Sequence, residues 1–530
     1  MHKTDIPIVE TGYFSELISA YISNDPKVSH LYGTPASLEQ MASQIAMKSA
    51  AFTLDQRNVL VTSLEAQYCD TAMSEKTRLH IQALSNEKTF TVVTGHQLNI
   101  FTGPLYFLYK IVTTINTCKA LKEAHPTLDF VPVYWMATED HDFEEINHFF
   151  VHGKKLSWEV PATGPVGRHT TEGLDVVFDA FSNELGTSEN AVTLKNLFKK
   201  AYLEHATLTE ATRYLVNALF ADYGLVILDG DDTLLKTAFA PVAKRELTTE
   251  FAHKAISEAD SFLSKHYKLQ VNPRDINLFY IKDKLRERIV VQENRFVINN
   301  TKYSFSKEEI LHELELHPER FSPNVILRPL YQELVLPNLA YVGGGGELAY
   351  WLQLKNMFTV SEVPFPMLLL RNSVLLATEK QAKKVSNLQL SFKDLFKKQD
   401  ALITEKVKEV SSLSLDFSKQ KQILEQLFAD LHPVVSKTDI SFEGALFAQE
   451  KKQRKGLEML EKRLLKAEKK KHADHVERIR LLQDALFPRK GLQERNVNFS
   501  ELYLEYGAAL IPNLISNLQP FQSVFTVLTK

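Results

Sequence analysis

The sequence contains little cysteine and no strong excess of charge. Its 530 residues include two cysteines, Cys69 and Cys118, which lie far apart and form no CxxC pair. A disulfide framework and a thiolate zinc site are therefore disfavoured, and a reducing cytoplasm is the expected location. The formal net charge of −3 argues against a protein that coats nucleic acid, so no nucleic-acid partner is predicted.

Long apolar runs are also missing from the sequence. Residues 1–5 contain no apolar signal core, and the strongest late apolar run, 365–377, is interrupted by Arg371 and Asn372. No membrane-spanning segment is therefore predicted. Hydrophobic residues make up 44% and charged residues 24% of the chain, as is usual for a globular protein. A chain of this length is expected to form roughly two to four structural units with a large buried core.

Short apolar runs recur along the first two thirds of the chain and alternate with longer amphipathic stretches. Near-continuous apolar runs are typical of buried parallel strands, so the runs predict an α/β fold with a parallel sheet. These runs are 89–93, 130–136, 225–228, 339–342 and 366–370. We expect the core to occupy residues 1–377, with insertions at about 151–220 and 250–325 that add helices and short strands.

The composition changes between about residues 378 and 483, where Lys, Glu, Gln and Leu dominate and Pro433 is the single proline. Two sets of residues repeat at heptad spacing, which predicts the seam of a coiled coil. They are Phe417, Gln420, Leu424, Leu427 and Leu431, and then Leu457, Leu460, Leu464 and Ala467. The break at 431–444 would reverse the chain and give an antiparallel helical arm that serves structure or oligomerisation. Residues 484–530 are expected to pack back on the core.

The stretch 94–106 follows an apolar run and opens a helical pattern, which predicts a strand, a polar turn and a helix start. Glycine in such a turn lets the backbone approach a ligand, and unpaired N–H groups at a helix start favour a phosphate or carboxylate. The candidate nucleotide- or substrate-binding residues are Thr94, Gly95, His96, Gln97, Gly103 and Pro104. An ordinary strand-to-helix connection capped by Thr102 is the alternative.

Acidic and imidazole side chains gather directly after the second apolar run, as Glu139, Asp140, His141 and Asp142. Open α/β sheets place their sites at this end of a strand. The cluster could bind a metal, act as acid or base, or hold an ammonium group. A helix N-terminus enriched in carboxylates is the alternative explanation.

Four consecutive glycines follow the fourth apolar run. Their cost in conformational entropy suggests a close approach of the backbone to a ligand, with positive φ, although the loop is no Walker motif. A carboxylate at the next helix start could bind a substrate amine, two aromatic rings could wall a pocket, and flanking arginines could bind substrate or phosphate. These candidates are Arg328, Gly343, Gly344, Gly345, Gly346, Glu347, Tyr350, Trp351 and Arg371. The alternatives are a flexible turn with core aromatics and structural pairing of Arg371.

Four blocks of this sequence, taken together, resemble the BshC family, the cysteine-adding enzymes of bacillithiol biosynthesis. The blocks are TGHQLNIFTGPLY (94–106), PVYWMATEDHDFEEIN (132–147), RPLYQELVLPNLAYVGGGGELAYW (328–351) and GLQERN (491–496). The resemblance runs through most of the chain, including the helical arm. It implies a Rossmann-type core similar to class I aminoacyl-tRNA synthetases, with connecting-peptide insertions and a coiled-coil arm that pairs two subunits.

Two positions depart from the family's usual pattern. The block TGHQ stands where TGQQ is usual, which makes His96 a departure, and GGGGE stands where GGPGE is common. The HIGH and KMSKS signatures of the synthetases are absent from the sequence. Activation by the side chains of those signatures therefore does not transfer to this chain.

The resemblance implies a ligase that joins cysteine to the amino group of glucosaminyl-malate in the last step of bacillithiol synthesis, with ATP forming a cysteinyl adenylate. In this interpretation, residues 94–97 and 103–104 hold phosphate or carboxylate, and Arg328, the glycines and Glu347 complete substrate binding. Asp140, His141 and Asp142 line the reaction site, where His141 or Asp140 helps to deprotonate the amine. No residue is assigned to a metal.

Two other functions fit the same residues. A metal-dependent hydrolase centred on residues 139–142 would need a metal and no ATP. A coiled-coil scaffold whose nucleotide-binding core has lost catalysis would bind nucleotide without turnover.

Overall fold

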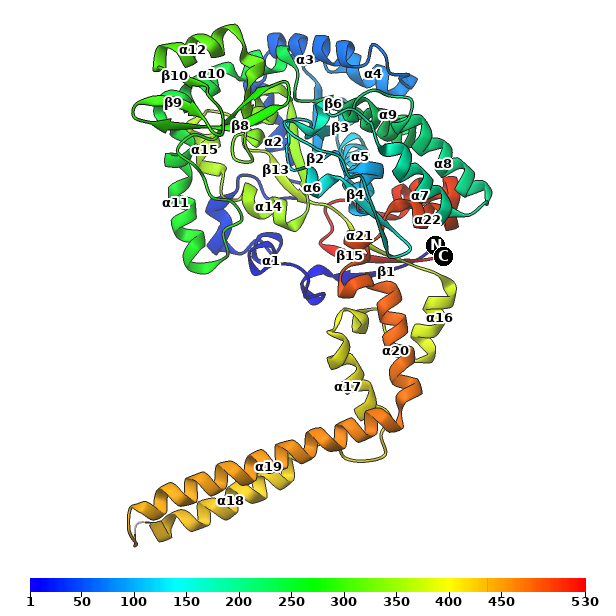
Figure 1. Cartoon of the computed structure of the whole chain (residues 1–530), viewed down its shortest axis with the longest axis vertical. Coiled ribbons are helices and arrows are strands. Elements are labelled where there is room, and N and C mark those ends of the chain that lie inside the picture. The colour runs from blue at the N-terminus through cyan, green and yellow to red at the C-terminus, as the bar shows by residue number, and fades with distance from the viewer. Residues whose placement is uncertain (436) are drawn as a thin grey trace. The chain divides into compact units, whose positions relative to one another are not determined.

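The computed structural model describes residues 1–435 and 437–530. The chain forms two compact units (Figure 1). The first unit comprises Met1–Leu375 and Gly491–Leu528, and the second comprises Leu376–Lys490 and Thr529–Lys530. The residues that follow the helical arm therefore return to the first unit.

A five-stranded parallel sheet lies at the centre of the first unit, with strand order β13-β12-β2-β3-β6. Its strands are β2 (Thr89–His96), β3 (Asp129–Met136), β6 (Val226–Asp229), β12 (Asn338–Gly343) and β13 (Met367–Leu370). Every residue of β2 and β12 is buried, as expected for strands covered on both faces. The predicted α/β class and parallel sheet are confirmed.

Helix α5 (Tyr106–Ala124) connects β2 to β3 and packs on both strands. Buried side chains such as Phe90, Phe130, Val342 and Leu369 fill a hydrophobic core cluster on this sheet. Because all five strands are parallel, their carboxyl ends meet at one edge, and the loops that follow them gather there.

The chain between β3 and β6 adds a β-hairpin and three long helices to the core. These elements are β4 (His148–Val151), β5 (Lys154–Ser157), α7 (Leu174–Leu185), α8 (Glu189–Tyr202) and α9 (Leu208–Phe220). The side chains of Ser188 and Thr207 cap α8 and α9. Both caps satisfy backbone N–H groups at the helix starts.

The chain between β6 and β12 adds three helices and an antiparallel sheet of order β10-β9-β8-β7-β11. The helices are α10 (Thr233–Thr249), α11 (Phe251–His266) and α12 (Lys307–Leu316). The strands are β7 (Leu278–Lys282), β8 (Leu285–Gln292), β9 (Arg295–Ile298), β10 (Ser304–Phe305) and β11 (Phe321–Pro323). Residues of β7, β8 and β11 in this sheet line the cavity described below.

Both ends of the first unit meet in a small sheet of order β1-β15-β14. Its strands are β1 (His2–Pro7), β14 (Ser373–Ala377) and β15 (Val524–Thr529). The short helices α21 (Gln493–Asn496), α22 (Phe499–Tyr506) and α23 (Leu510–Asn517) precede β15. This pairing holds the segment that follows the arm within the first unit.

The second unit is helical, and its longest helices run antiparallel as a hairpin (Figure 1). Its helices are α16 (Glu379–Asn387), α17 (Gln399–Val410), α18 (Ser418–Val435), α19 (Ser441–Lys471) and α20 (Ala473–Leu486). Across the hairpin, Lys421 Nζ lies 2.6 Å from Glu461 Oε2. The predicted helical arm is confirmed.

The predicted heptad seam of this arm has the wrong phase. Phe417, just before α18, and Lys421, Leu424 and Phe428 on it are half-buried or buried, whereas Gln420, Leu427 and Leu431 are exposed. On α19, Leu457 and Leu464 are half-buried, whereas Leu460 and Ala467 are exposed. The actual stripe on α18 runs 4-3-4 from Phe417, because Phe428 fills the seam in place of Leu427.

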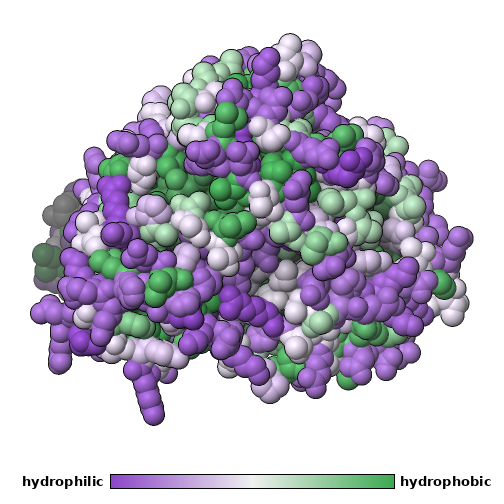
Figure 2. Space-filling view, turned by 90° about the horizontal axis from the view of Figure 1, so that it is seen from above, coloured by the Kyte–Doolittle hydropathy of each residue, from purple (hydrophilic) through white to green (hydrophobic). Residues whose placement is uncertain are grey.

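None of the helices in the described part of the chain is long and apolar enough to span a membrane. The face of the molecule seen in Figure 2 is mostly hydrophilic at its rim, with apolar side chains gathered towards its centre.

Candidate functional site

The carboxyl edge of the parallel sheet opens into a cavity of about 580 Å³, the main cavity of the first unit. Residues that follow β2, β3 and β12 line one part of it, and residues of the antiparallel sheet line another. The predicted site residues in its wall are Gly95, His96, Gln97, Glu139, Asp140, His141, Arg328, Glu347 and Tyr350. Segments far apart in the sequence thus converge on one cavity.

Of the four predicted residues at 94–97, three line this wall: Gly95 and His96, which end β2, and Gln97, which follows it. A Cβ at Gly95 would lie 3.3 Å from Tyr341 Oη and 3.6 Å from Arg328 Nη1, so the backbone is close to both side chains. Gln97 Nε2 donates hydrogen bonds to Asp140 Oδ2 at 2.8 Å and Glu145 Oε2 at 2.7 Å. Thr94 is buried instead, and its hydroxyl donates to the Val342 carbonyl at 2.8 Å.

His96 lies in the same wall with an almost fully buried ring. Tyr106 and Phe107 contact it, with ring centroids 5.5 and 5.0 Å away. Burial and the nearby charges of Lys110 and Arg371 hold its pKa well below the usual value, so the imidazole is neutral. Its Nε2 has no hydrogen-bond partner among the described residues.

Gly103 and Pro104 lie outside the main cavity, beside a small cavity of about 90 Å³. Gly103 has φ +60°, and a Cβ there would lie 2.6 Å from Asn99 Cβ. Asn498 Nδ2 donates to the carbonyls of Phe101 at 2.8 Å and Gly103 at 2.7 Å. The glycine therefore serves a left-handed turn that the C-terminal segment fixes in place.

The acidic residues after β3 have separate environments. Glu139 is buried against the Lys236 ammonium, which also donates to the Phe321 carbonyl at 2.9 Å, and burial raises the pKa of Glu139. Asp140 Oδ1 accepts a hydrogen bond from the His141 N–H at 2.7 Å. Asp142 is exposed, precedes α6 (Phe143–Ile146) and does not line the main cavity.

His141 is oriented by an arginine of the antiparallel sheet. Arg286 Nη1 lies 2.6 Å from His141 Nδ1. Because a guanidinium can only donate, Nδ1 must accept this hydrogen bond, and the ring proton lies on Nε2. Burial and the Arg286 charge lower the pKa of His141, which favours this neutral tautomer.

Lys110 is a cavity residue that the sequence patterns missed. Its side chain is 3% exposed, and Nζ lies 2.6 Å from the Gly95 carbonyl oxygen and 2.6 Å from Glu347 Oε1. Tyr341 donates to Glu347 Oε2 at 2.9 Å. Burial lowers the pKa of Lys110, whereas the Glu347 charge opposes this shift. A single lysine in an otherwise apolar helical stretch was the only signal for this residue.

The remaining predicted residues near β12 differ in their exposure to the cavity. Arg328 donates to Gln332 Oε1 at 3.0 Å and Tyr350 Oη at 3.4 Å, and both Arg328 and Tyr350 line the cavity. Trp351 is fully buried, with its ring stacked on Tyr341 at 4.4 Å. Trp351 is therefore a core side chain that supports the cavity wall from behind.

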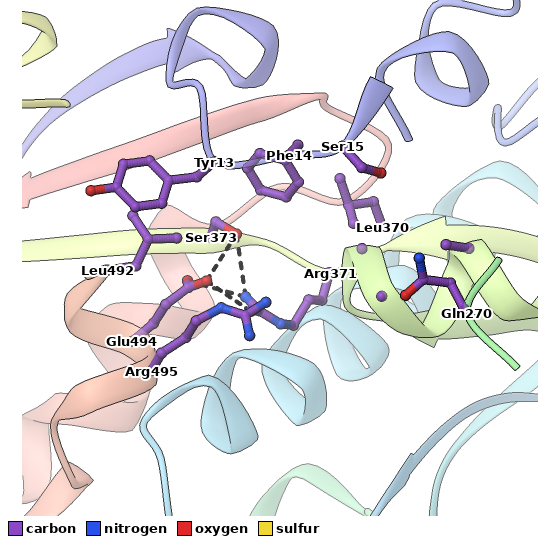
Figure 3. Close-up of a pocket in the computed structure, with 13 residues that line it drawn as sticks. Tyr13, Phe14, Ser15, Gln270, Leu370, Arg371, Ser373, Leu492, Glu494 and Arg495 are labelled. Atoms are coloured by element: carbon purple, nitrogen blue, oxygen red, sulfur yellow. Dashed lines mark hydrogen bonds and ion pairs between the residues drawn. The ribbon is translucent and has the colours of Figure 1, made fainter. Parts of the chain in front are cut away.

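The four glycines do not have the expected positive φ. Gly343 is required by packing, because a Cβ there would lie 3.0 Å from both Leu348 Cδ2 and Tyr341 Cε1. The N–H of Gly344 donates to Glu347 Oε1 at 3.3 Å. Gly345 and Gly346 line a second cavity of about 180 Å³, shown in Figure 3.

Arg371 also lines this second cavity, where it is paired with a carboxylate. Its Nη2 and Nη1 donate to Glu494 Oε1 at 2.7 Å and Oε2 at 3.1 Å, as Figure 3 shows. The two side chains are 4% and 1% exposed. Glu494 comes from the GLQERN block and was not predicted as a partner, because its distance in sequence hides the pair.

Family models match almost the whole chain. The model described as "Bacillithiol biosynthesis BshC, N-terminal Rossmann-like domain" matches residues 1–372, and the model for the C-terminal coiled-coil domain matches residues 374–530. The chain belongs to the BshC family. The resemblance inferred from the four sequence blocks is thereby confirmed, as are the Rossmann-like core and the coiled-coil arm.

Relatives of this BshC-family chain carry the name "Putative cysteine ligase BshC". The protein of Flavobacterium johnsoniae is 54% identical and that of Christiangramia forsetii is 52% identical, each over 98% of both chains. A crystal structure titled "putative arginyl T-RNA synthetase" from Campylobacter jejuni is 11% identical, covering 83% of this chain and 97% of that one. Its TM-score of 0.20 is too low to support an argument about the fold.

Within residues 1–435 and 437–530, no group of three or more His, Cys, Asp or Glu residues is arranged to hold a metal ion. In this BshC-family chain, Glu139 faces Lys236 and His141 Nδ1 faces Arg286. Because these partners are cations, Glu139 and His141 are engaged in an ion pair and a hydrogen bond.

Proposed function

We propose that this chain is a ligase that joins the carboxyl group of cysteine to the amino group of glucosaminyl-malate, in the cytoplasm. The main cavity carries the proposal, because it combines fixed cations with carboxylates at the carboxyl edge of a parallel sheet. Such an edge suits one substrate that is anionic and another that bears an amine. The cysteine ligase name of relatives that match 98% of the chain supports this choice.

Amide formation from a free carboxylate requires activation, because an oxide ion is a poor leaving group. In the proposed reaction, the cysteine carboxylate attacks the α-phosphorus of ATP and pyrophosphate leaves. The amine nitrogen then attacks the acyl carbon, and AMP leaves with the electrons of the C–O bond. Gly95 fits an anionic co-substrate, because its bare backbone lies beside the Arg328 guanidinium in the cavity wall.

Asp140 is the proposed base for the attacking amine. The His141 Nδ1 accepts from Arg286 and its Nε2 carries the proton, so neither ring nitrogen is free to take another. The Asp140 carboxylate lines the cavity and is oriented by Gln97 and by the His141 N–H. His141 instead serves as a hydrogen-bond donor through Nε2–H.

The test is product formation by the purified full chain supplied with cysteine, glucosaminyl-malate and ATP. Mass spectrometry should detect the amide product together with AMP and pyrophosphate. Release of ADP and phosphate would contradict the adenylate route. Metal-dependent hydrolysis without ATP would favour the hydrolase, and nucleotide binding without any turnover would favour the scaffold.

Variants of the proposed base sharpen this test. Asp140→Asn should lower the rate of product formation by about 10²–10⁴-fold, the usual contribution of general base catalysis. His141→Gln keeps a side-chain donor and should retain more activity than Asp140→Asn. Thermal unfolding of both variants provides the control, and equal losses of activity and stability would make the cluster structural.

We also propose that the arm pairs two copies of the chain. Ile423, Leu427, Leu431 and Val434 follow one another at 4-4-3 spacing on α18 and are 60%, 52%, 40% and 48% exposed. A symmetric partner would cover this apolar stripe. Leu427→Glu combined with Leu431→Glu should therefore give monomers in light scattering. Gln422→Glu with Ala429→Glu, at exposed positions of α18 away from this stripe, provides a charge-changing control. A variant dimer that persists at low concentration would place the interface elsewhere.

A further inference from the structure

Two arginines in the wall of the main cavity, Arg274 and Arg288, have no hydrogen-bond or ion-pair partner for their guanidinium groups among the described residues. The other cations of the wall are engaged. Lys110 pairs with Glu347, Arg328 donates to Gln332, and Arg286 donates to His141. The cavity wall thus has two guanidinium groups that no side chain in the described part of the protein engages.

The backbone that carries Arg274 is fixed from within the fold. The Arg274 N–H donates to Asn277 Oδ1 at 3.1 Å, and Asn277 Nδ2 donates to the Arg274 carbonyl at 2.7 Å. Asn277 is fully buried, and its N–H and Nδ2 both donate to Glu246 Oε1, at 3.0 and 2.9 Å. A buried carboxylate therefore holds the loop between α11 and β7, so that Arg274 projects from a rigid support.

Arg288 is fixed by the antiparallel sheet. It lies two residues after Arg286 on β8, so both side chains emerge from the same face of the strand. Its neighbour in the sheet is Phe279, which also lines the cavity. Glu287 points to the opposite face, where Asn300 Nδ2 donates to it at 3.3 Å. The cavity face of β8 is therefore cationic.

We infer that Arg274 and Arg288 form a subsite for a dicarboxylate, and that it binds the malyl group of the amine substrate. The inference rests on the proposed function and adds the residues that recognise the substrate. Malyl has two carboxylates, and each planar guanidinium can donate two parallel hydrogen bonds to one of them. Two arginines match a dianion in charge, and the backbone that carries each of them is already fixed by the fold. Asp140, in the same cavity, would then face the glucosamine amine.

Calorimetry on the full chain without ATP tests this inference. The probes are glucosaminyl-malate and methyl glucosaminide, which lacks both carboxylates. Arg274→Gln and Arg288→Gln should each weaken glucosaminyl-malate binding about tenfold or more, the usual effect of a lost charge-assisted hydrogen bond. Neither change should alter the binding of methyl glucosaminide. Arg295→Gln is the matched control, because Arg295, on β9, pairs with Glu309 of α12 and does not line the cavity.

The outcomes separate this inference from the proposed function. Wild-type affinity of both arginine variants for glucosaminyl-malate would overturn the subsite. An equal loss for both probes would also overturn it, since it would show a general disturbance of the cavity. If the wild-type chain makes the product while the variants keep its KM, the function stands and the subsite fails. If the wild-type chain does not bind glucosaminyl-malate, both fail together.

Discussion

Two ion pairs at the carboxyl edge of the same sheet, Lys110–Glu347 in the main cavity and Arg371–Glu494 in the second, differ in how completely the protein encloses them. In the main cavity Lys110 is 3% exposed, but its partner Glu347 is 27% exposed. In the second cavity Arg371 and Glu494 are 4% and 1% exposed and share two hydrogen bonds. The Glu347 carboxylate is therefore accessible from the main cavity, whereas both members of the Arg371–Glu494 pair are shielded from solvent.

This difference suggests different roles: the Lys110–Glu347 pair belongs to the wall of the candidate site, whereas the Arg371–Glu494 pair is structural. Arg371 follows β13, and Glu494 lies in the segment that returns after the arm, so their pair ties the two chain segments that flank the arm. Glu494 also accepts a hydrogen bond from the Val374 N–H at 3.2 Å. Lys110 instead donates a hydrogen bond to the Gly95 carbonyl at the end of β2, beside the proposed co-substrate site. The same kind of charge pair thus serves two purposes.

The largest effect is expected when the enclosed pair is broken. Glu494→Leu leaves the Arg371 guanidinium buried without a counter-charge and should lower the free energy of unfolding by about 3–5 kcal/mol. Denaturant unfolding measures this change. Arg371→Met combined with Glu494→Leu should recover most of the loss, because no charge then remains buried. A loss below about 1 kcal/mol for Glu494→Leu would show that solvent reaches the pair.

A smaller change in stability, with a larger change in activity, is expected for the open pair. Glu347→Gln removes the counter-charge of Lys110 but leaves an amide whose oxygen can still accept from the ammonium and whose NH2 can donate to the Tyr341 hydroxyl. We expect the free energy of unfolding to fall by about 1–2 kcal/mol. The rate of product formation should fall at least about tenfold, because Lys110 and the end of β2 lose their orientation. Full activity in a destabilised variant would make this pair structural as well.

The smallest effect concerns His96, whose pKa is lowered by burial and then by the cations of both pairs, Lys110 and Arg371. Below a pH of about 6.5 the unfolded histidine binds a proton that the native histidine refuses, so stability is lost as the pH falls. The variant His96→Gln, which restores the residue usual in the family, should remove this part of the pH dependence. Relative to wild type, the variant should gain about 1 kcal/mol between pH 7 and pH 5.5.

Thermal or denaturant unfolding at both values of pH measures this shift. His80→Gln is a control at a less deeply enclosed histidine, whose ring lies 2.6 Å from the Gly224 carbonyl and whose pKa is also lowered by burial. A stability difference between His96→Gln and wild type that does not change with pH would mean that His96 takes up a proton as readily in the native state as in the unfolded state. The charges of Lys110 and Arg371 would then not lower the pKa of His96.

Local patterns were sufficient to predict the five strands of the parallel sheet. The apolar runs at 89–93 and 130–136 became the buried strands β2 and β3, because a strand covered on both faces has no polar side. The arm was predicted from its composition, yet the phase of its seam was wrong. Heptad spacing allows more than one register, and the packing of Phe428 between the helices selects one of them.

The sequence by itself determined the α/β class, the helical arm and the family, and it picked out two segments, 95–97 and 139–141, that line the main cavity, since each of these was read from neighbouring residues. Only the tertiary structure decided which charges meet. It paired Lys110 with Glu347 and Arg286 with His141. It also buried Arg371 against Glu494, which leaves this predicted phosphate-binding arginine in a structural ion pair. The physical reason is that the free energy of a charge depends on its burial and its partners, and distant segments of the chain supply both.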